Sequence, residues 1–379
     1  MLFPFYSLIV FCYAALRLLP GLPLTRKSKI AAALFMLLAS LYHLISRYLL
    51  RSLAAPELPA PVLMIQGWLF FALVLLFAML LLRDVTLIAL WLARRTGLTA
   101  RLPGSPLRQA GIMISIALVL SAYGVWQGVR PPEARSVEII LPDLPTALDG
   151  FTLAHITDPH ASALLRGPRV RAMVDTVMAM QPDLIVLSGD LVDGSVERRW
   201  RDVAPLADLT APHGVFSGIG NHEYYSGYND WMARFAELGF TMLENSHIVI
   251  EVNGASLVIA GTTDQVAERF GLPGPDTDAA LAGSPENATR ILLEHRPGNA
   301  RENAAKGVHL QLSGHTHGGH FLGFDRIVAR FNNGFVSGLY QLDSMQLYVS
   351  HGAGLWSGFP VRLGVPSEVT RIVLRAGAR

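Results

Sequence analysis

Five short clusters of Asp, Asn and His residues follow one another in the second half of the chain. They are Asp158-Pro159-His160, Gly189-Asp190, Gly220-Asn221-His222, a single His295 and Gly314-His315-Thr316-His317. Nearly every cluster follows a short apolar run, and most contain glycine, which allows a sharp turn. In open α/β sheets, the loops leaving the carboxyl ends of the strands converge on one crevice. We therefore expect these side chains to meet there, where oxygen and nitrogen ligands without cysteine suit a pair of divalent metal ions rather than a structural zinc.

The segments around these clusters alternate between strand-like and helix-like patterns. Short apolar runs predict strands, and apolar residues at helical spacing predict helices. The expected strands are 151–157, 184–187, 215–219, 248–252, 257–259 and 308–312. The expected helices are 169–180, 231–238 and 289–293. This alternation predicts an α/β domain built in layers.

The five clusters, with Asp193 three residues after Asp190, resemble the five ordered sequence blocks of the calcineurin-like metallophosphoesterases. The likeness extends over roughly 151–375 and is greatest to a branch whose members have N-terminal membrane or export segments. The segments 348–354 and 360–362 fit the ending of that branch. The resemblance implies a four-layer α/β/β/α sandwich, in which two mixed sheets face each other and helices cover both.

The resemblance also implies a role for each residue of the clusters. Seven would be metal ligands: Asp158, His160 and His317 on one ion, Asn221, His295 and His315 on the other, and Asp190 bridging both. His222 would stand just outside the metals, as a general acid or as a clamp on phosphate oxygens. Asp193 would orient a ligand or the bridging loop.

Such a site has the chemistry of phosphoester hydrolysis. Two divalent ions bind phosphate oxygens, lower the pKa of a bridging water and stabilise an in-line transition state. Two carboxylates with neutral His and Asn leave a site with two such ions net positive, which favours an anionic substrate. Ligands of this mixed type accommodate Mn, Fe or Zn, and the sequence does not choose among them.

Two positions depart from the family pattern, and three others have an open role. Pro159 replaces an aliphatic residue and stiffens a turn, whereas His320 stands where glutamine is common. His320 is interpreted as a surface change, an extra phosphate contact or an alternative ligand. His155 is expected to be a packed core residue, and His351 to line the crevice or to be structural. Arg296 is expected either to contact phosphate or to form a surface salt bridge.

The first part of the chain has a different composition. Residues 1–130 contain 12 of the 31 Lys and Arg residues and 2 of the 29 acids, which leaves 19 − 27 = −8 for the remainder. Four apolar stretches, 2–24, 30–50, 62–82 and 111–128, are expected to span a membrane. We therefore expect a four-helix transmembrane region at 1–130, a linker or first strand at 131–150 and the metallophosphoesterase domain at 151–379. Spans without a buried acid give little support to a transport role.

The positive charges predict the orientation of these spans. Arg and Lys concentrate in the first and third loops, at positions 26, 27, 29, 94, 95, 101 and 108. Loops of this kind remain in the cytoplasm. With four spans, the C-terminal domain would therefore be extracytoplasmic; in a bacterium it would face outward from the inner membrane.

The expected activity is hydrolysis of a phosphodiester or pyrophosphate bond by a metal-activated water, in a membrane-associated or lipid-linked substrate. One alternative is a UDP-diacylglucosamine-type pyrophosphohydrolase, which requires a cytoplasmic site. The other is a membrane scaffold or sensor with a vestigial metal fold. The acidic domain gives no support to nucleic-acid binding, and the single Cys12 excludes an internal disulfide. The oligomeric state is left open.

Overall fold

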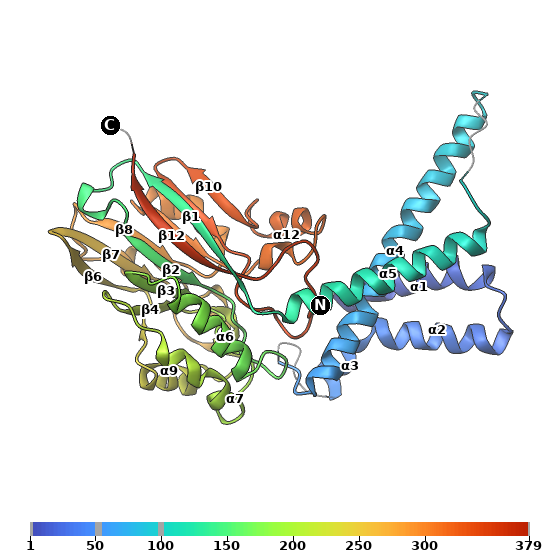
Figure 1. Cartoon of the computed structure of the whole chain (residues 1–379), viewed down its shortest axis with the longest axis horizontal. Coiled ribbons are helices and arrows are strands. Elements are labelled where there is room, and N and C mark those ends of the chain that lie inside the picture. Colours follow the sequence, from blue (N-terminus) through green and yellow to red (C-terminus); the bar gives the residue numbers. More distant parts are fainter. Residues whose placement is uncertain (1–2, 50–54, 98–101, 378–379) are drawn as a thin grey trace. The chain divides into compact units, whose positions relative to one another are not determined.

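The computed structural model describes residues 3–49, 55–97 and 102–377. They form two compact units, Met1–Trp126 and Gln127–Arg379 (Figure 1). Positions 2, 50 and 101, used above for the ends of two spans and for one loop charge, lie outside the described residues.

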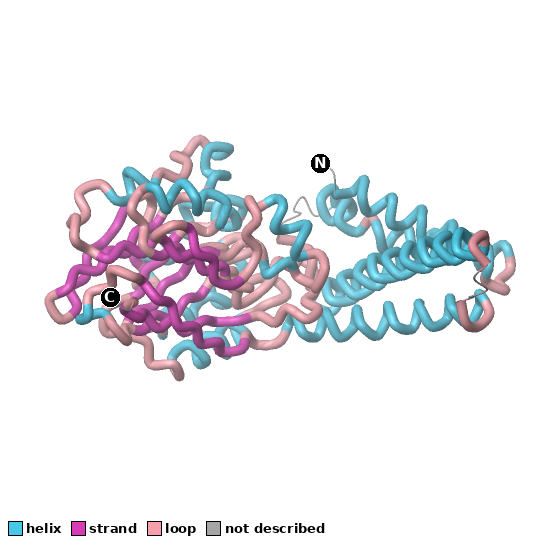
Figure 2. The backbone as a smooth tube through the Cα atoms, turned by 90° about the horizontal axis from the view of Figure 1, so that it is seen from above, coloured by secondary structure: helices cyan, strands magenta, loops and turns pink. Residues whose placement is uncertain are grey.

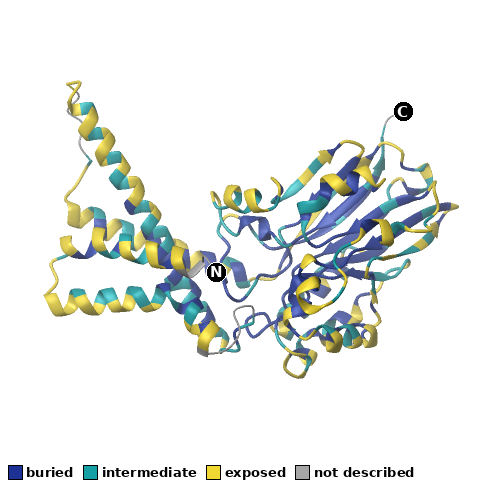
Figure 3. Cartoon of the chain, turned by 180° about the vertical axis from the view of Figure 1, so that it is seen from behind, coloured by how far each residue is buried: buried dark blue, intermediate teal, exposed yellow. Residues whose placement is uncertain are grey.

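The first unit consists of helices. They are α1 (Phe3–Leu18), α2 (Arg26–Ser40), α3 (Tyr42–Leu49), α4 (Ala60–Arg94) and most of α5 (Pro106–Val129). Small and aliphatic side chains from α1, α4 and α5, among them Ala14, Leu76 and Ala117, form its core. Many large apolar side chains remain exposed on the outer faces, as expected for helices surrounded by lipid (Figure 3).

The number of spans is smaller than expected. By length and composition, α4 and α5 can cross a membrane, and the bent pair of α2 and α3 could form a third span. The remaining apolar helix, α1, has 16 residues, fewer than the roughly 20 that a span needs. The expectation of four spans is therefore corrected to two, or at most three, among the described residues. Because α4 continues past Leu82 to Arg94, it also contains an acid, Asp84.

The second unit contains two six-stranded sheets (Figures 1 and 2). The first has the order β1-β12-β2-β3-β4-β5 and the second β10-β11-β9-β8-β7-β6. The strands of the first sheet are β1 (Glu133–Leu141), β2 (Thr152–Ile156), β3 (Leu184–Ser188), β4 (Val215–Gly218), β5 (Thr241–Met242) and β12 (Glu368–Ala376). Those of the second are β6 (Ser246–Val252), β7 (Ala255–Gly261), β8 (Thr289–Leu293), β9 (Leu310–Ser313), β10 (Gly338–Leu342) and β11 (Met345–Val349).

Alternating side chains on these strands build the layers. Leu184 and Val186 of β3 pack against the second sheet, where they share one core with Ile291 and Leu293 of β8. Ile185 of β3 lies on the opposite face, in a core with the helices α6 (Gly167–Met178) and α9 (Tyr228–Glu237). The second sheet is covered in the same way by α10 (Thr277–Leu281) and α11 (Ala300–Ala305). The expected α/β/β/α sandwich is confirmed.

Two segments form strands whose pairing partners could not be predicted from the local sequence pattern. Residues 289–293, expected to be helical, form strand β8 between β7 and β9, because the buried apolar run Ile291-Leu292-Leu293 suits a central strand. Within 131–150, β1 pairs in parallel with β12 near the other end of the chain. Only residues 130–132 separate the end of α5 from β1.

Glu368 joins these two distant strands. Its carboxylate accepts hydrogen bonds from the Tyr348 hydroxyl at 2.8 Å and from Arg135 of β1 at 3.0 Å. Burial opposes ionisation of Glu368, but His351, Tyr348 and Arg135 outweigh it and lower the pKa of the carboxyl. An acid with a lowered pKa stabilises the fold above its ordinary pKa of 4.5, and this contribution disappears as the pH falls through the folded-state pKa.

We predict that Glu368→Gln lowers the free energy of unfolding of the domain by about 1–3 kcal/mol at pH 7, because Arg135 loses its charged partner. The deficit should shrink below pH 4.5. Urea unfolding of the full chain, followed by tryptophan fluorescence, measures both effects. Glu138→Gln is the matched control, since Glu138 pairs with Arg375 on the exposed surface and should change stability by less than about 1 kcal/mol. Equal effects of the two substitutions would contradict the prediction.

Candidate metal centre

The five clusters lie at one end of the facing sheets, immediately after β2, β3, β4, β8 and β9. Together with Asp193, their ligand atoms form three groups, within each of which all atoms lie within 4.8 Å of one another. Two groups contain only expected metal ligands, Asp158, His160 and His317 in one and Asp190, His295 and His315 in the other, and the third joins His160 to Asp193 and His222. The structure therefore brings together six of the seven residues expected to hold metal.

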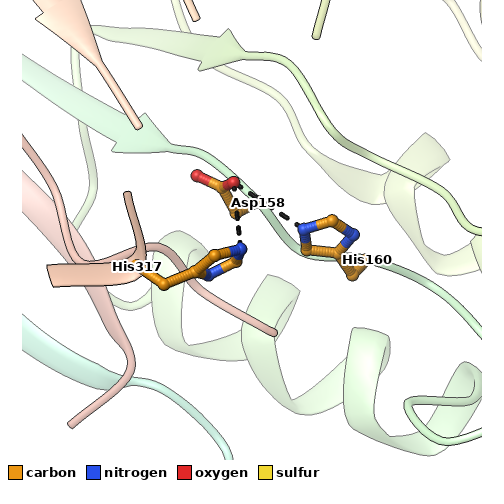
Figure 4. Close-up of side chains that lie close together, drawn as sticks. All are labelled: Asp158, His160 and His317. Carbon is orange, nitrogen blue, oxygen red and sulfur yellow. Dashed lines mark ion pairs between the residues drawn. The ribbon is translucent and has the colours of Figure 1, made fainter. Parts of the chain in front are cut away.

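In the first group the side chains point toward one another (Figure 4). The Asp158 Oδ1 atom lies 3.7 Å from His160 Nε2 and 3.6 Å from His317 Nε2. All three residues are buried. These separations leave room for a cation between the atoms, since Zn–N and Zn–O bonds are about 2.0–2.2 Å long.

Asp190 lies between the two groups. Its Oδ2 atom is 3.1 Å from His295 Nε2 and 3.7 Å from His160 Nε2. The other oxygen, Oδ1, accepts a hydrogen bond from the backbone N–H of His222 at 2.8 Å. One oxygen of Asp190 thus fixes the carboxylate, and the other faces ligands of both groups.

The hydrogen bonds of two imidazoles show whether the site fits metal ions. The buried Nε2 atoms of His160 and His295 have no hydrogen-bond partner. Their Nδ1 atoms are held by Asp193 Oδ1 at 3.1 Å and by the Ser188 carbonyl at 2.8 Å. Metal-binding histidines are usually oriented in this way, by a bond from the ring nitrogen that does not ligate. The donor set therefore fits divalent cations.

The backbone of the site is strained. Asp158, His160, Asp190, His315 and His317 all have φ between 45° and 67°. Such conformations in residues other than glycine cost of order 1–3 kcal/mol each and concentrate at functional sites. Five of the seven expected ligands are therefore held in a conformation that most residues avoid.

Glycines make this crowding possible. A Cβ atom on Gly220 would lie 2.2 Å from Asp190 Oδ1, and one on Gly314 would lie 2.1 Å from Asp158 Oδ2. Both distances are shorter than any normal contact, so a larger residue at either position would displace the carboxylate beside it. This explains why glycine accompanies the clusters in the sequence.

His222 stands beside the two groups, in the first turn of α8 (Asn221–Tyr225). Its Nδ1 atom hydrogen-bonds Asp193 Oδ1, which also holds His160, and its Nε2 atom lies 3.9 Å from Asp190 Oδ2. Burial disfavours the charged imidazole, but Asp190 and Asp193 outweigh this effect and raise the pKa of His222. These two carboxylates therefore favour the protonated form of His222.

The role of Arg296, which the sequence left open between a phosphate contact and a surface salt bridge, follows from its contacts. It forms a 2.6 Å ion pair with the buried Asp264, so the salt bridge is not a surface one. Its guanidinium also donates to Asn221 Oδ1 at 3.0 Å and lies 3.3 Å from His315 Nε2. Arg296 thus places a fixed positive charge against two of the expected ligands.

Three other histidines lie outside these ligand groups. His155 is buried and hydrogen-bonds Ser188 Oγ at 2.8 Å, and burial lowers its pKa to about 4. His320 packs 4.9 Å from the His317 ring, with its Nδ1 3.3 Å from the Val361 carbonyl. His351 lies beside the Pro366 carbonyl and Gly318. Each therefore supports the walls of the site.

Two residues of the site had no role in the sequence interpretation. Glu223 accepts hydrogen bonds from the N–H groups of Asp190, Leu191 and Gly220, and so ties the loops after β3 and β4 together. Its place directly after His222 is the only sequence signal for it.

Arg362 is the second such residue, and it is completely buried. It donates to the carbonyls of His317, His351 and Gly354 and fixes the loops beside Asp158. Arg362 belongs to the segment 360–362 that resembles the ending of the family branch, but that resemblance gave no indication of this role.

Known proteins share the sequence pattern of this domain. Residues 151–319 match the family model of the calcineurin-like phosphoesterases. A transmembrane protein with a metallophosphoesterase domain from Danio rerio is 32% identical over 71% of this chain and 63% of its own. A metallophosphoesterase of Helicobacter pylori is 34% identical over 69% of this chain and 70% of its own.

The similarities have clear limits. The chain spans only 57–63% of the length of the Danio rerio relative and of two further relatives, from Bos taurus and Caenorhabditis elegans. Among solved structures, a 5'-nucleotidase precursor of Thermus thermophilus gives a TM-score of 0.38 at 17% identity, over 59% of this chain and 54% of its own, which is too low to add support. The identity and coverage of the Helicobacter relative, together with the matched family model, show that this chain belongs to the calcineurin-like metallophosphoesterase family.

Proposed function

We propose that the protein is a membrane-bound, two-metal phosphoesterase that hydrolyses a phosphodiester or pyrophosphate bond in a lipid-linked substrate. One observation supports this proposal above all. Two buried imidazoles, His160 and His295, direct Nε2 atoms without hydrogen-bond partners toward the same oxygen of Asp190. Imidazole nitrogens without hydrogen bonds are costly in a buried site, and a cation beside the Asp190 carboxylate, whose Oδ2 atom is 3.1 and 3.7 Å away, would satisfy them.

The proposed ligands divide into two sets around Asp190. They are Asp158, His160 and His317 for one ion, and Asn221, His295 and His315 for the other. Bound there, two divalent ions would supply Lewis-acid polarisation of the phosphate and would lower the pKa of an attacking water. Two carboxylates against four positive charges leave the site attractive to an anion.

The surrounding side chains have separate tasks in this proposal. His222, oriented by Asp193 and lying beside Asp190, donates a proton to the departing oxygen. Arg296, held by Asp264, would bind a phosphate oxygen, and Asn221 and His315 beside it would be ligands of the second ion. Asp193 fixes the orientation of His160 and His222 relative to each other.

The membrane helices support a lipid-linked substrate. Helices α4 and α5 are long and apolar enough to span, and relatives are named transmembrane proteins. The connection from α5 to β1 is only three residues long, which would hold the domain close to the bilayer surface. A substrate carried in the same bilayer would be within reach of such a site.

The first prediction from this proposal concerns activity. The full chain in detergent should hydrolyse bis-p-nitrophenyl phosphate when Mn²⁺ is added, and a chelator should abolish this activity. Asp190→Asn should lower kcat/KM by more than about a hundredfold, beyond the loss typical of residues outside the ligand set. Asp278→Asn, at an exposed aspartate, should leave kcat/KM unchanged. A protein that retains full activity with Asp190→Asn would rule out the proposed centre.

The second prediction concerns the proton donor. His222→Gln should lower kcat/KM by about 10²–10⁴-fold for phenyl phosphate esters, whose leaving group needs a proton. The loss should be much smaller for p-nitrophenyl esters, whose leaving group departs as an anion. Metal content should match the unsubstituted protein, since His222 is not a proposed ligand. An equal loss with both esters would show that His222 does not act as a general acid.

The third prediction concerns orientation. A single cysteine placed by Asn287→Cys in a Cys12→Ser background lies on an exposed loop of the domain. We expect a membrane-impermeant maleimide to label it in intact cells, because the basic loops of the helical unit favour the cytoplasm. Labelling only after lysis would place the domain in the cytoplasm and would favour the pyrophosphohydrolase alternative.

A further inference from the structure

A cluster of charged residues lies between α1 and α4 in the helical unit. Asp84 Oδ2 accepts hydrogen bonds from Arg17 at 2.5 Å and from the Tyr13 hydroxyl at 2.8 Å. Asp84 Oδ1 accepts from Arg83 at 3.0 Å. The side chains of Arg83 and Asp84 are only 15% and 14% exposed. One carboxylate therefore compensates two guanidinium groups in an apolar bundle.

A cavity of about 420 Å³ adjoins this cluster. Its lining includes Arg17, Arg83, Arg94 and Gln109, and no acid. Counting the neighbouring Asp84, the charge here is 3 − 1 = +2. The rest of the lining is largely apolar, with Leu87 and Leu102 among its residues. The cavity thus combines an excess of positive charge with surface suited to hydrocarbon.

The length of α4 places this cavity at a membrane boundary. The uncharged part of the helix, Ala60 to Leu82, covers about 34 Å at ~1.5 Å per residue. The hydrocarbon core of a bilayer is about 30 Å thick. Arg83 and Asp84 therefore fall where hydrocarbon gives way to lipid headgroups.

We propose that this cavity binds the phosphate headgroup of an anionic membrane lipid. Guanidinium groups match phosphate oxygens in a bidentate manner, and Arg17 and Arg83 are already oriented by Asp84. Uncompensated positive charge beside hydrocarbon is costly, and a lipid phosphate neutralises it. The apolar lining contacts the glycerol and upper acyl groups. This site is separate from the metal centre and does not depend on the catalytic activity.

Native mass spectrometry of the full chain tests the proposal. Binding of phosphatidylglycerol is compared with that of phosphatidylcholine of the same acyl length, and inorganic phosphate is titrated separately. We expect at least tenfold tighter binding of phosphatidylglycerol than of either. Equal binding of the two lipids would overturn the proposal. If inorganic phosphate bound as tightly as phosphatidylglycerol, the ligand of this cavity would be a soluble anion and not a lipid.

Four variants locate the site. Arg17→Gln and Arg94→Gln should each weaken phosphatidylglycerol binding about fivefold. Arg94→Gln leaves the Asp84 cluster intact, so its effect does not arise from misfolding. Arg26→Gln, at an exposed position that does not line the cavity, should have no effect. Asp84→Asn removes the negative charge beside the arginines and should tighten the binding of phosphatidylglycerol. Weaker binding would show that these arginines have only a structural role. Unchanged binding in Arg94→Gln would contradict the proposal.

Discussion

The buried carboxylate of Asp190 sets the electrostatics of the catalytic domain. Three imidazoles, those of His160, His222 and His295, have an Nε2 atom within 3.9 Å of its Oδ2 atom. Burial opposes charging of these rings, but Asp190 and nearby carboxylates raise the pKa of His295 to about 9. Protons therefore balance the site when cations are absent, and cations have to displace them. Metal affinity should consequently fall as the pH decreases, because ligands must be deprotonated to bind.

The same carboxylate explains the surrounding architecture. Its loop is held by Glu223, its neighbour Gly220 leaves no space for a Cβ atom, and its backbone is strained. Arg362 plays the corresponding role for the loops beside Asp158. The rigid sandwich below these loops offsets the strain, which is how a functional site keeps a conformation that is locally unfavourable. Substitutions that loosen the loops should therefore affect metal binding before they affect the fold.

Local patterns predicted the alternation of strands and helices and the position of the polar clusters after the strands, whereas the four layers and the ligand roles were implied by the family resemblance. Pairing between β1 and β12 joins opposite ends of the domain and leaves no local trace. Residues 289–293 were misread because a short apolar run fits either a helix or a strand until its neighbours are known. The uncharged stretch expected to span ended at Leu82, before Arg83 and Asp84, yet Arg17 on another helix neutralises Asp84, and α4 continues to Arg94. Buried charges are predictable only together with their partners.

The proposed hydrolysis depends on the binding of two cations at Asp190. Calorimetric titration of the metal-free full chain with Mn²⁺, in buffers of different ionisation enthalpy, counts the ions and the protons that they displace. We expect two ions per chain to bind, with release of protons at neutral pH. One ion per chain, or two bound without proton release, would contradict this expectation.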